Sequence, residues 1–138
     1  YPEFIQFVKD SIRELSAKGH QVEIEGIFYH LGENDMSFHP YRKEAAARVR
    51  AIINQSRKDL AQPGLRWYVS QQPPTDVERL NKLDVVSDMV RVAAADPDFI
   101  HLKAFNLSPQ EKMLVITTEG IVQLGEVIAE GYLGSPSE

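Results

Sequence analysis

The chain has 138 residues, 43% of them hydrophobic, which is enough for one compact domain with its own core. A formal net charge of −5 and a sequence pI of about 5.4 argue against a general attraction to nucleic acid. The sequence contains no cysteine, which excludes disulfides, thiolate nucleophiles and cysteine metal sites. It also has no apolar stretch near the roughly 18–20 residues that span a membrane.

The first residues, Tyr1-Pro2-Glu3-Phe4, do not form a secretory signal peptide, because they lack a basic start and a long apolar run. The sequence does not begin with Met, so we expect it to lie inside a longer reading frame. A cysteine-free composition suits oxidising and reducing environments alike, and the compartment is therefore left open.

Helices and strands alternate along the predicted chain. Apolar residues at helical spacing predict helices at 4–18, 41–61 and 75–95, and a last helix that starts near Thr117 or Thr118. Residues rich in β-branched and aromatic side chains predict strands at 22–29, 65–70 and 99–102. This order argues for a parallel sheet with helices on both faces. Three strands leave an exposed edge, which we expect to self-associate or to pair with a further segment.

The apolar stripes also predict which side chains face the core. Ile52 on the second helix and Val90 on the third belong to the predicted inward faces. Trp67 and Tyr68 alternate on the second strand, so one of the two should be buried, and an exposed Trp67 could serve as a carbohydrate platform.

The stretch from Gly26 to Asp35 carries the strongest functional signal. Apolar strand residues lead into a polar loop, Gly32-Glu33-Asn34-Asp35, at the carboxyl end of a predicted parallel strand, where open α/β sheets bind ligands. Gly32 permits close backbone approach and Asn34 offers an uncharged amide, so both could donate hydrogen bonds to a developing oxyanion. The alternative is a strand-to-helix turn that Asn34 or Asp35 caps.

Other residues at the same predicted edge are candidate ligand contacts. Glu33 could bind a sugar hydroxyl, and Phe38 with His39 could line a sugar pocket, although an exposed loop would carry the same residues. Gln71, where the second strand ends, could contact a ligand or satisfy backbone groups. His101 ends the third strand and is a candidate base, or simply a polar residue at a strand end.

Two alternatives find little support. The four histidines are scattered and no carboxylate spacing resembles a metal site, so we expect no metal. A nucleotide-binding module is disfavoured because no glycine-rich phosphate loop follows any predicted strand. His30, beside the Gly32 loop, is expected to be a hydrogen-bonded strand residue.

Four stretches resemble those of SGNH hydrolases, in particular the sialic-acid-specific acetylesterase-like carbohydrate esterases. They are 4–35 with the Gly-x-Asn-Asp loop, 41–57, 65–72 and 117–125. The resemblance implies a flavodoxin-like three-layer α/β/α fold, with residues 1–138 as one unit that is the C-terminal portion of a longer domain. It also implies hydrolysis of an ester, often an acetyl group on a sugar, by a serine triad without a cofactor, and it allows a secreted or periplasmic location.

The sequence departs from this family at the triad. The family's serine lies in an N-terminal Gly-x-Ser-type block, which this sequence lacks. Spacing from Gly120 places the family's Asp and His positions at Lys112 and Val115, and an isopropyl group cannot accept a proton. We expect a segment of a carbohydrate esterase whose nucleophile lies outside this sequence. The alternative, favoured by Val115, is a non-catalytic pseudo-esterase that binds a carbohydrate or a protein partner.

Overall fold

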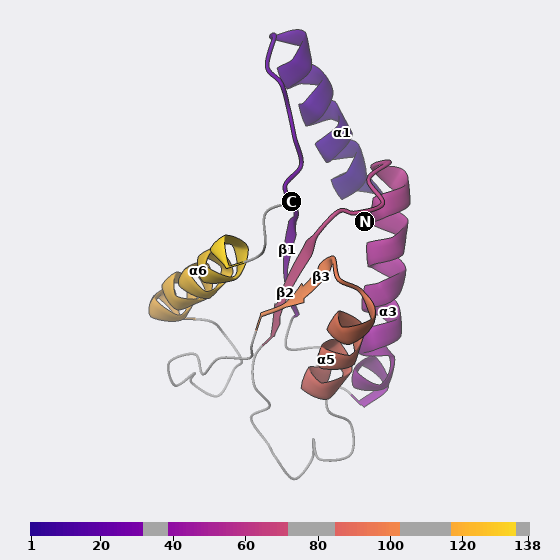
Figure 1. Cartoon of the computed structure of the whole chain (residues 1–138), viewed down its shortest axis with the longest axis vertical. Coiled ribbons are helices and arrows are strands. Elements are labelled where there is room, and N and C mark those ends of the chain that lie inside the picture. The colour runs from indigo at the N-terminus through magenta and orange to yellow at the C-terminus, as the bar shows by residue number, and fades with distance from the viewer. Residues whose placement is uncertain (32–38, 72–84, 103–116, 135–138) are drawn as a thin grey trace.

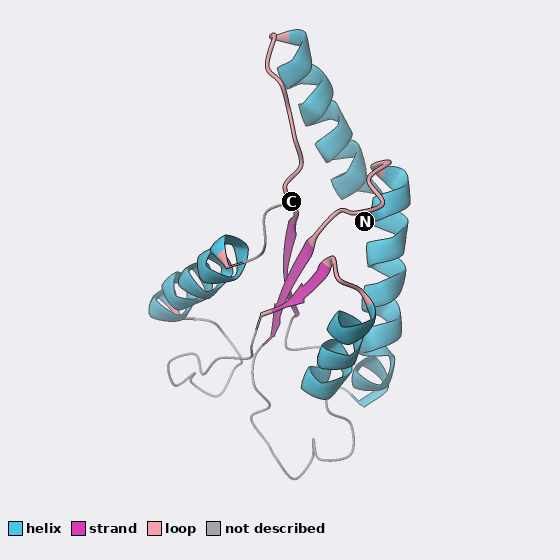
Figure 2. Ribbon diagram, viewed as in Figure 1, coloured by secondary structure: helices cyan, strands magenta, loops and turns pink. Residues whose placement is uncertain are grey.

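The computed structural model describes residues 1–31, 39–71, 85–102 and 117–134. Their elements are, in order, α1 (Pro2–Ala17), β1 (Ile27–Leu31), α3 (His39–Asp59), β2 (Trp67–Gln71), α5 (Val85–Ala95), β3 (Phe99–His101) and α6 (Thr118–Leu133). The three strands form a parallel sheet in the order β1-β2-β3. Helices α3 and α5 lie on one side of the sheet and α6 on the other, so the predicted α/β layering is confirmed (Figure 1, Figure 2).

The strand register determines which side chains share a face of the sheet. Ile27 pairs with Trp67 and Leu31 with Gln71, while Val69 pairs with His101 on β3. Because side chains alternate along a strand, Ile27, Trp67, Val69, Gln71 and His101 point to the face that α3 and α5 cover. The intervening residues of each strand point toward α6.

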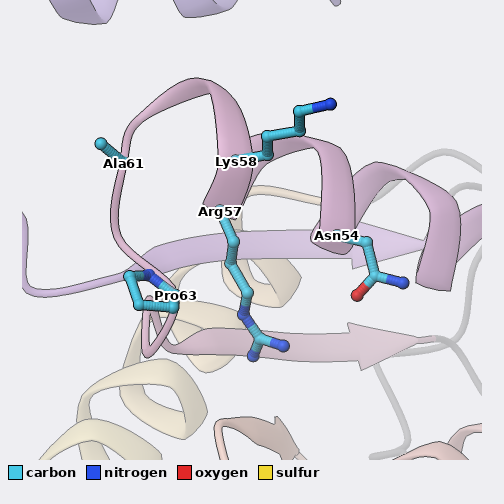
Figure 3. A pocket seen from close by; sticks show the side chains of 5 residues that line it. All are labelled: Asn54, Arg57, Lys58, Ala61 and Pro63. Carbon is cyan, nitrogen blue, oxygen red and sulfur yellow. The ribbon is translucent and has the colours of Figure 1, made fainter.

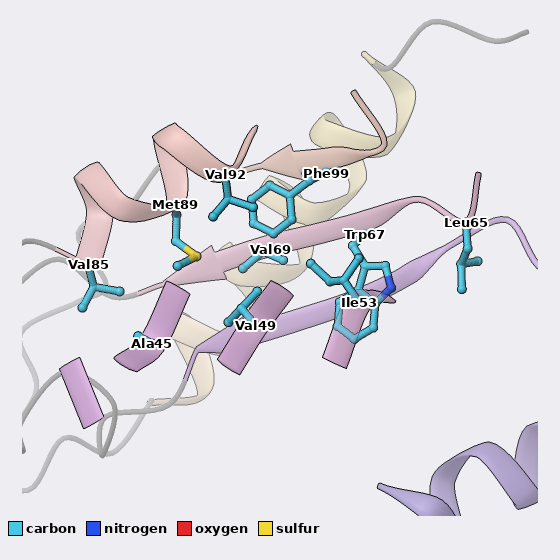
Figure 4. Packing of buried hydrophobic residues seen from close by; sticks show 10 residues of the cluster. All are labelled: Ala45, Val49, Ile53, Leu65, Trp67, Val69, Val85, Met89, Val92 and Phe99. Atoms are coloured by element: carbon cyan, nitrogen blue, oxygen red, sulfur yellow. The ribbon is translucent and has the colours of Figure 1, made fainter. Parts of the chain in front are cut away.

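The core lies between the sheet and the pair α3 and α5. The buried apolar side chains of this cluster come from both helices, from β2 and β3 and from Leu65 just before β2 (Figure 4), and they are Ala45, Val49, Ile53, Leu65, Trp67, Val69, Val85, Met89, Val92 and Phe99. The indole Nε1 of Trp67 donates to Ser56 Oγ at 3.1 Å, and Ser56 Oγ donates to the Ile53 carbonyl at 2.8 Å. The one polar group of the Trp67 ring is therefore satisfied inside the core.

Strand β2 is buried on both faces, because it is the central strand of a parallel sheet with helices on each side. Trp67 and Tyr68 are accordingly both buried, where the sequence predicted only one. The hypothesis that Trp67 is exposed as a carbohydrate platform is therefore wrong, since its ring packs against α3. Tyr68 stacks instead on Phe28, with ring centroids 4.8 Å apart, on the α6 side.

On two helices, the sequence predicted more inward-facing residues than the structure shows. Ile52 is exposed and Val90 is 53% exposed, because a step of about 100° per residue turns each away from its buried neighbour, Ile53 or Met89. The first strand begins at Ile27 rather than at residue 22. The third helix is described from Val85 to Ala95, and the rest of its predicted span, 75–84, lies outside the described residues.

Helix α1 extends away from the sheet (Figure 1). Ile5 is its buried residue, whereas Phe7 is 70% exposed. The Tyr1 hydroxyl donates to Asp59 Oδ2 at 2.9 Å, which ties the start of α1 to the end of α3. Gly19 follows the helix with φ of +88°, a conformation that side chains with a Cβ rarely adopt, and α1 ends at Ala17, close to the predicted limit at residue 18.

Helix α6 starts where the sequence predicted, since Thr117 is its N-cap and Thr117 Oγ1 accepts a hydrogen bond from the Gly120 N–H at 3.1 Å. Tyr132 near its end lies 5.9 Å from Tyr68, centroid to centroid. Gly131 approaches Leu102 so closely that a Cβ there would overlap the leucine side chain. Across the described residues, no helix has the length and apolar character needed to cross a membrane.

Candidate functional site

Polar side chains gather at the carboxyl edge of the sheet. His30 and Ser70 are the penultimate residues of β1 and β2, Gln71 ends β2 and His101 ends β3. The strands are parallel and adjacent, so these positions lie at the same edge, the one at which open α/β sheets bind ligands. The amino halves of the same strands are apolar, which leaves the polar residues concentrated at this one end.

His30 and Ser70 form a hydrogen-bonded pair on the α6 side of the sheet. They are register partners, and 2.8 Å separates His30 Nδ1 from Ser70 Oγ. Ser70 is 1% exposed, so the bond is shielded from water. The interpretation of His30 as a hydrogen-bonded strand residue is confirmed. Its partner was missed because the pairing depends on the register of β1 against β2, which the sequence does not display.

Gln71 and His101 occupy the opposite side of the sheet, toward α3 and α5. Gln71 is 0% exposed, and neither its Oε1 nor its Nε2 has a hydrogen-bond partner among the described residues. The Nε2 of His101 is likewise buried without a partner in that part of the chain. Burial lowers the pKa of His101 below its ordinary value of 6.5, so the imidazole is mainly neutral at pH 7.

The remaining candidate residues divide by position. Gly32, Glu33, Asn34 and Phe38 lie outside the described residues, as do Lys112 and Val115. His39 is the first residue of α3, although its side chain is not described. The structure therefore brings together two of the predicted residues, Gln71 and His101. Leu31, the register partner of Gln71, is the last residue of β1 and directly precedes Gly32 in the sequence.

The opposite, amino edge of the sheet carries a hollow of about 480 Å³. Its lining comes from the end of α3 and the turn that follows (Figure 3), namely Asn54, Arg57, Lys58, Ala61 and Pro63. The Arg57 guanidinium is already engaged there, since it donates to both carboxylate oxygens of Asp96 and to the Leu65 carbonyl. This hollow lies before β2 rather than after it, away from the edge at which parallel sheets bind ligands.

Metal-ligating side chains are dispersed in the part of the chain that the structure describes. No group of three or more histidine, aspartate or glutamate side chains there could hold a metal ion. The hydrogen-bonding groups at the carboxyl edge are instead an imidazole and hydroxyl pair on one face and an amide with a second imidazole on the other. Such uncharged donors and acceptors suit recognition of hydroxyl, carbonyl or amide groups.

These features define an α/β/α domain with a parallel sheet and a polar carboxyl edge, the architecture of SGNH-like hydrolases. A family model described as carbohydrate esterase, sialic acid-specific acetylesterase, matches residues 1–134. The chain belongs to this family of carbohydrate esterases. Neither the comparison with curated proteins nor that with solved structures found a match.

Proposed function

We propose that this chain supplies the oxyanion loop and the ligand-lining edge of a carbohydrate-ester site, and that a serine outside this sequence supplies the nucleophile. The observation that carries the proposal is the strand register, which sets Leu31 beside Gln71 and Val69 beside His101. The last residue of β1 therefore lies beside the polar end of β2, and the sequence continues from it into Gly32. Membership of a carbohydrate esterase family supports the substrate class.

In this proposal the residues after β1 stabilise the transition state. Attack on an acetyl carbonyl turns its oxygen into an oxyanion, which the Gly32 backbone N–H and the Asn34 amide would bind. Glu33, Phe38, His39 and Gln71 would contact the sugar. His101 would accept the proton from the attacking hydroxyl, and the lowered pKa of its imidazole favours the neutral form that a general base requires.

The second candidate is a pseudo-esterase that binds the carbohydrate, or a protein partner, without cleaving an ester. Val115, at the position where the family spacing puts a histidine, favours this candidate because an isopropyl group cannot shuttle protons. The two candidates share the same edge and the same ligand contacts. They differ only in whether a serine and an imidazole complete the chemistry.

Hydrolysis and active-site labelling distinguish the two. The 138-residue chain and the protein in its full reading frame would each be incubated with p-nitrophenyl acetate, with O-acetylated sugars and with a fluorophosphonate. The first candidate is supported if the protein in its full reading frame shows turnover and serine labelling and the 138-residue chain shows neither. Sugar binding without either supports the pseudo-esterase, and the absence of turnover, labelling and sugar binding would contradict both.

A pair of asparagine variants tests the oxyanion assignment. Asn34→Ala should lower kcat by about 10²–10³-fold in an active protein, as loss of an oxyanion donor does. Asn54→Ala, in the hollow at the opposite edge, is the control and should leave kcat unchanged. Equal kcat values for the two variants would contradict the assignment.

Self-association through β1 also stays a proposal. Among the described strands, β1 pairs only with β2, so its other edge has no strand partner there. Sedimentation velocity should then show a dimer or larger species at micromolar concentration. A stable monomer would contradict self-association through this edge.

A further inference from the structure

We propose that Gln71 and His101 form one polar subsite that binds a neutral hydrogen-bonding group of a carbohydrate, a hydroxyl or an acetamido group. The proposal rests on the carbohydrate-binding function inferred above and assigns a ligand class to one part of that edge. It does not depend on whether an ester is cleaved.

The geometry of the sheet brings the two side chains together. Val69 is the register partner of His101, and Gln71 is the next residue of β2 on the same face. Strand and residue spacings then put the Cα atoms of Gln71 and His101 about 8 Å apart on the diagonal. Side chains of this length can converge on one small group placed between them, at the edge where the strands end.

The Gln71 side chain is buried with both of its polar atoms unpaired among the described residues. The buried hydroxyl of Ser56 bonds to Ile53 and Trp67, and that of Ser70 bonds to His30, whereas the Tyr68 hydroxyl on the α6 face also lacks a partner in the described part of the chain. Buried amides are normally satisfied, so an unpaired one at the ligand edge indicates a site for an external group.

The chemistry of the pair selects the ligand. The Gln71 amide offers two N–H donors and one acceptor, and a neutral imidazole offers one of each. A hydroxyl or a secondary amide can donate and accept at once, so it matches both side chains. A carboxylate would lose water there without gaining an opposite charge from either residue, which makes it a poor ligand for this subsite.

A matched pair of glutamine variants provides the test. Gln71→Met keeps the length of the side chain and removes the amide, whereas Gln55→Met changes an exposed glutamine on α3 that bonds to Asp59. Calorimetry of the protein with N-acetylglucosamine, glucose and N-acetylneuraminic acid should show neutral-sugar binding that Gln71→Met weakens at least tenfold. Gln55→Met should leave the Kd unchanged. Because the buried amide has no partner to lose, Gln71→Met should not lower Tm.

NMR of the wild-type protein covers the case in which Gln71→Met fails to fold. The neutral sugars should shift the Gln71 side-chain amide and the His101 imidazole resonances more than those of Gln55. The proposal is overturned if neutral sugars do not bind, if they bind without shifting these resonances, or if Gln71→Met binds them as tightly as wild type. Failure of the oxyanion and nucleophile assignments would appear separately, as missing turnover and labelling while neutral-sugar binding persists.

Discussion

Replacing Arg57 by Met should cost far more stability than the same change at Arg91. The Arg57 guanidinium donates to Asp96 Oδ2 at 2.6 Å and Oδ1 at 3.2 Å, and its Nε donates to the Leu65 carbonyl at 3.0 Å. These contacts join the end of α3 to the turns before β2 and β3. Breaking a buried pair from one side costs about 3–5 kcal/mol because the other charge is left unpaired.

The partial exposure of the pair reduces this magnitude. The Arg57 and Asp96 side chains are 12% and 24% exposed, so we expect a loss of about 2–4 kcal/mol in the free energy of unfolding. Arg91 is 75% exposed and pairs with Asp88 within α5, so Arg91→Met should cost about 0–1 kcal/mol.

Urea denaturation at pH 7, followed by circular dichroism, measures both losses. For a chain of this size, each 1 kcal/mol corresponds to roughly 3–5 °C, so Arg57→Met should also lower Tm by roughly 6–20 °C. If Arg57→Met is no less stable than Arg91→Met, the ion pair does not hold these turns together and the reasoning is refuted.

Three further outcomes are expected. Ser70→Ala should lower the free energy of unfolding by about 0.5–1.5 kcal/mol, because the hydrogen bond between Ser70 Oγ and His30 Nδ1 is lost; an unchanged urea midpoint would contradict this. The pKa of His101 is lowered in the folded state, so stability should be highest above pH 6.5 and fall as the pH drops below it. Urea midpoints between pH 5 and 8 should depend less on pH in His101→Asn. Thr117→Ala should cost about 0.5–2 kcal/mol through loss of the α6 N-cap, and Thr117→Ser should restore most of it.

The order and type of the elements follow from local patterns, which is why the sequence predicts them well. Gly19 and Thr117 mark helix ends through their own backbone and side-chain chemistry, without help from distant residues. Strand limits are less local. Val22 and Ile24 suit a strand by composition, yet β1 begins only at Ile27, where pairing with β2 starts. A strand exists where a neighbour accepts its hydrogen bonds, and the sequence does not display that neighbour.

The positions of the candidate residues could be predicted only in part. Gln71 and His101 could be placed at the carboxyl edge because each ends an apolar strand, and strand ends are readable from composition. The link between His30 and Ser70 required the register of two strands that lie 40 residues apart in the chain. The sequence predicted wrongly that Ile52 and Val90 face inward. Each is an apolar residue beside the apolar stripe of its helix, and only the packing of the helix shows which of these residues are buried.

Chemical-shift mapping with an O-acetylated sugar tests most directly whether the carboxyl edge of the sheet is the binding site. Perturbations should cluster at Gly32, Asn34, Gln71 and His101, where the parallel strands end. Perturbations that centre instead on Arg57 and the hollow at the amino edge, or no perturbations at saturating sugar, would contradict the account.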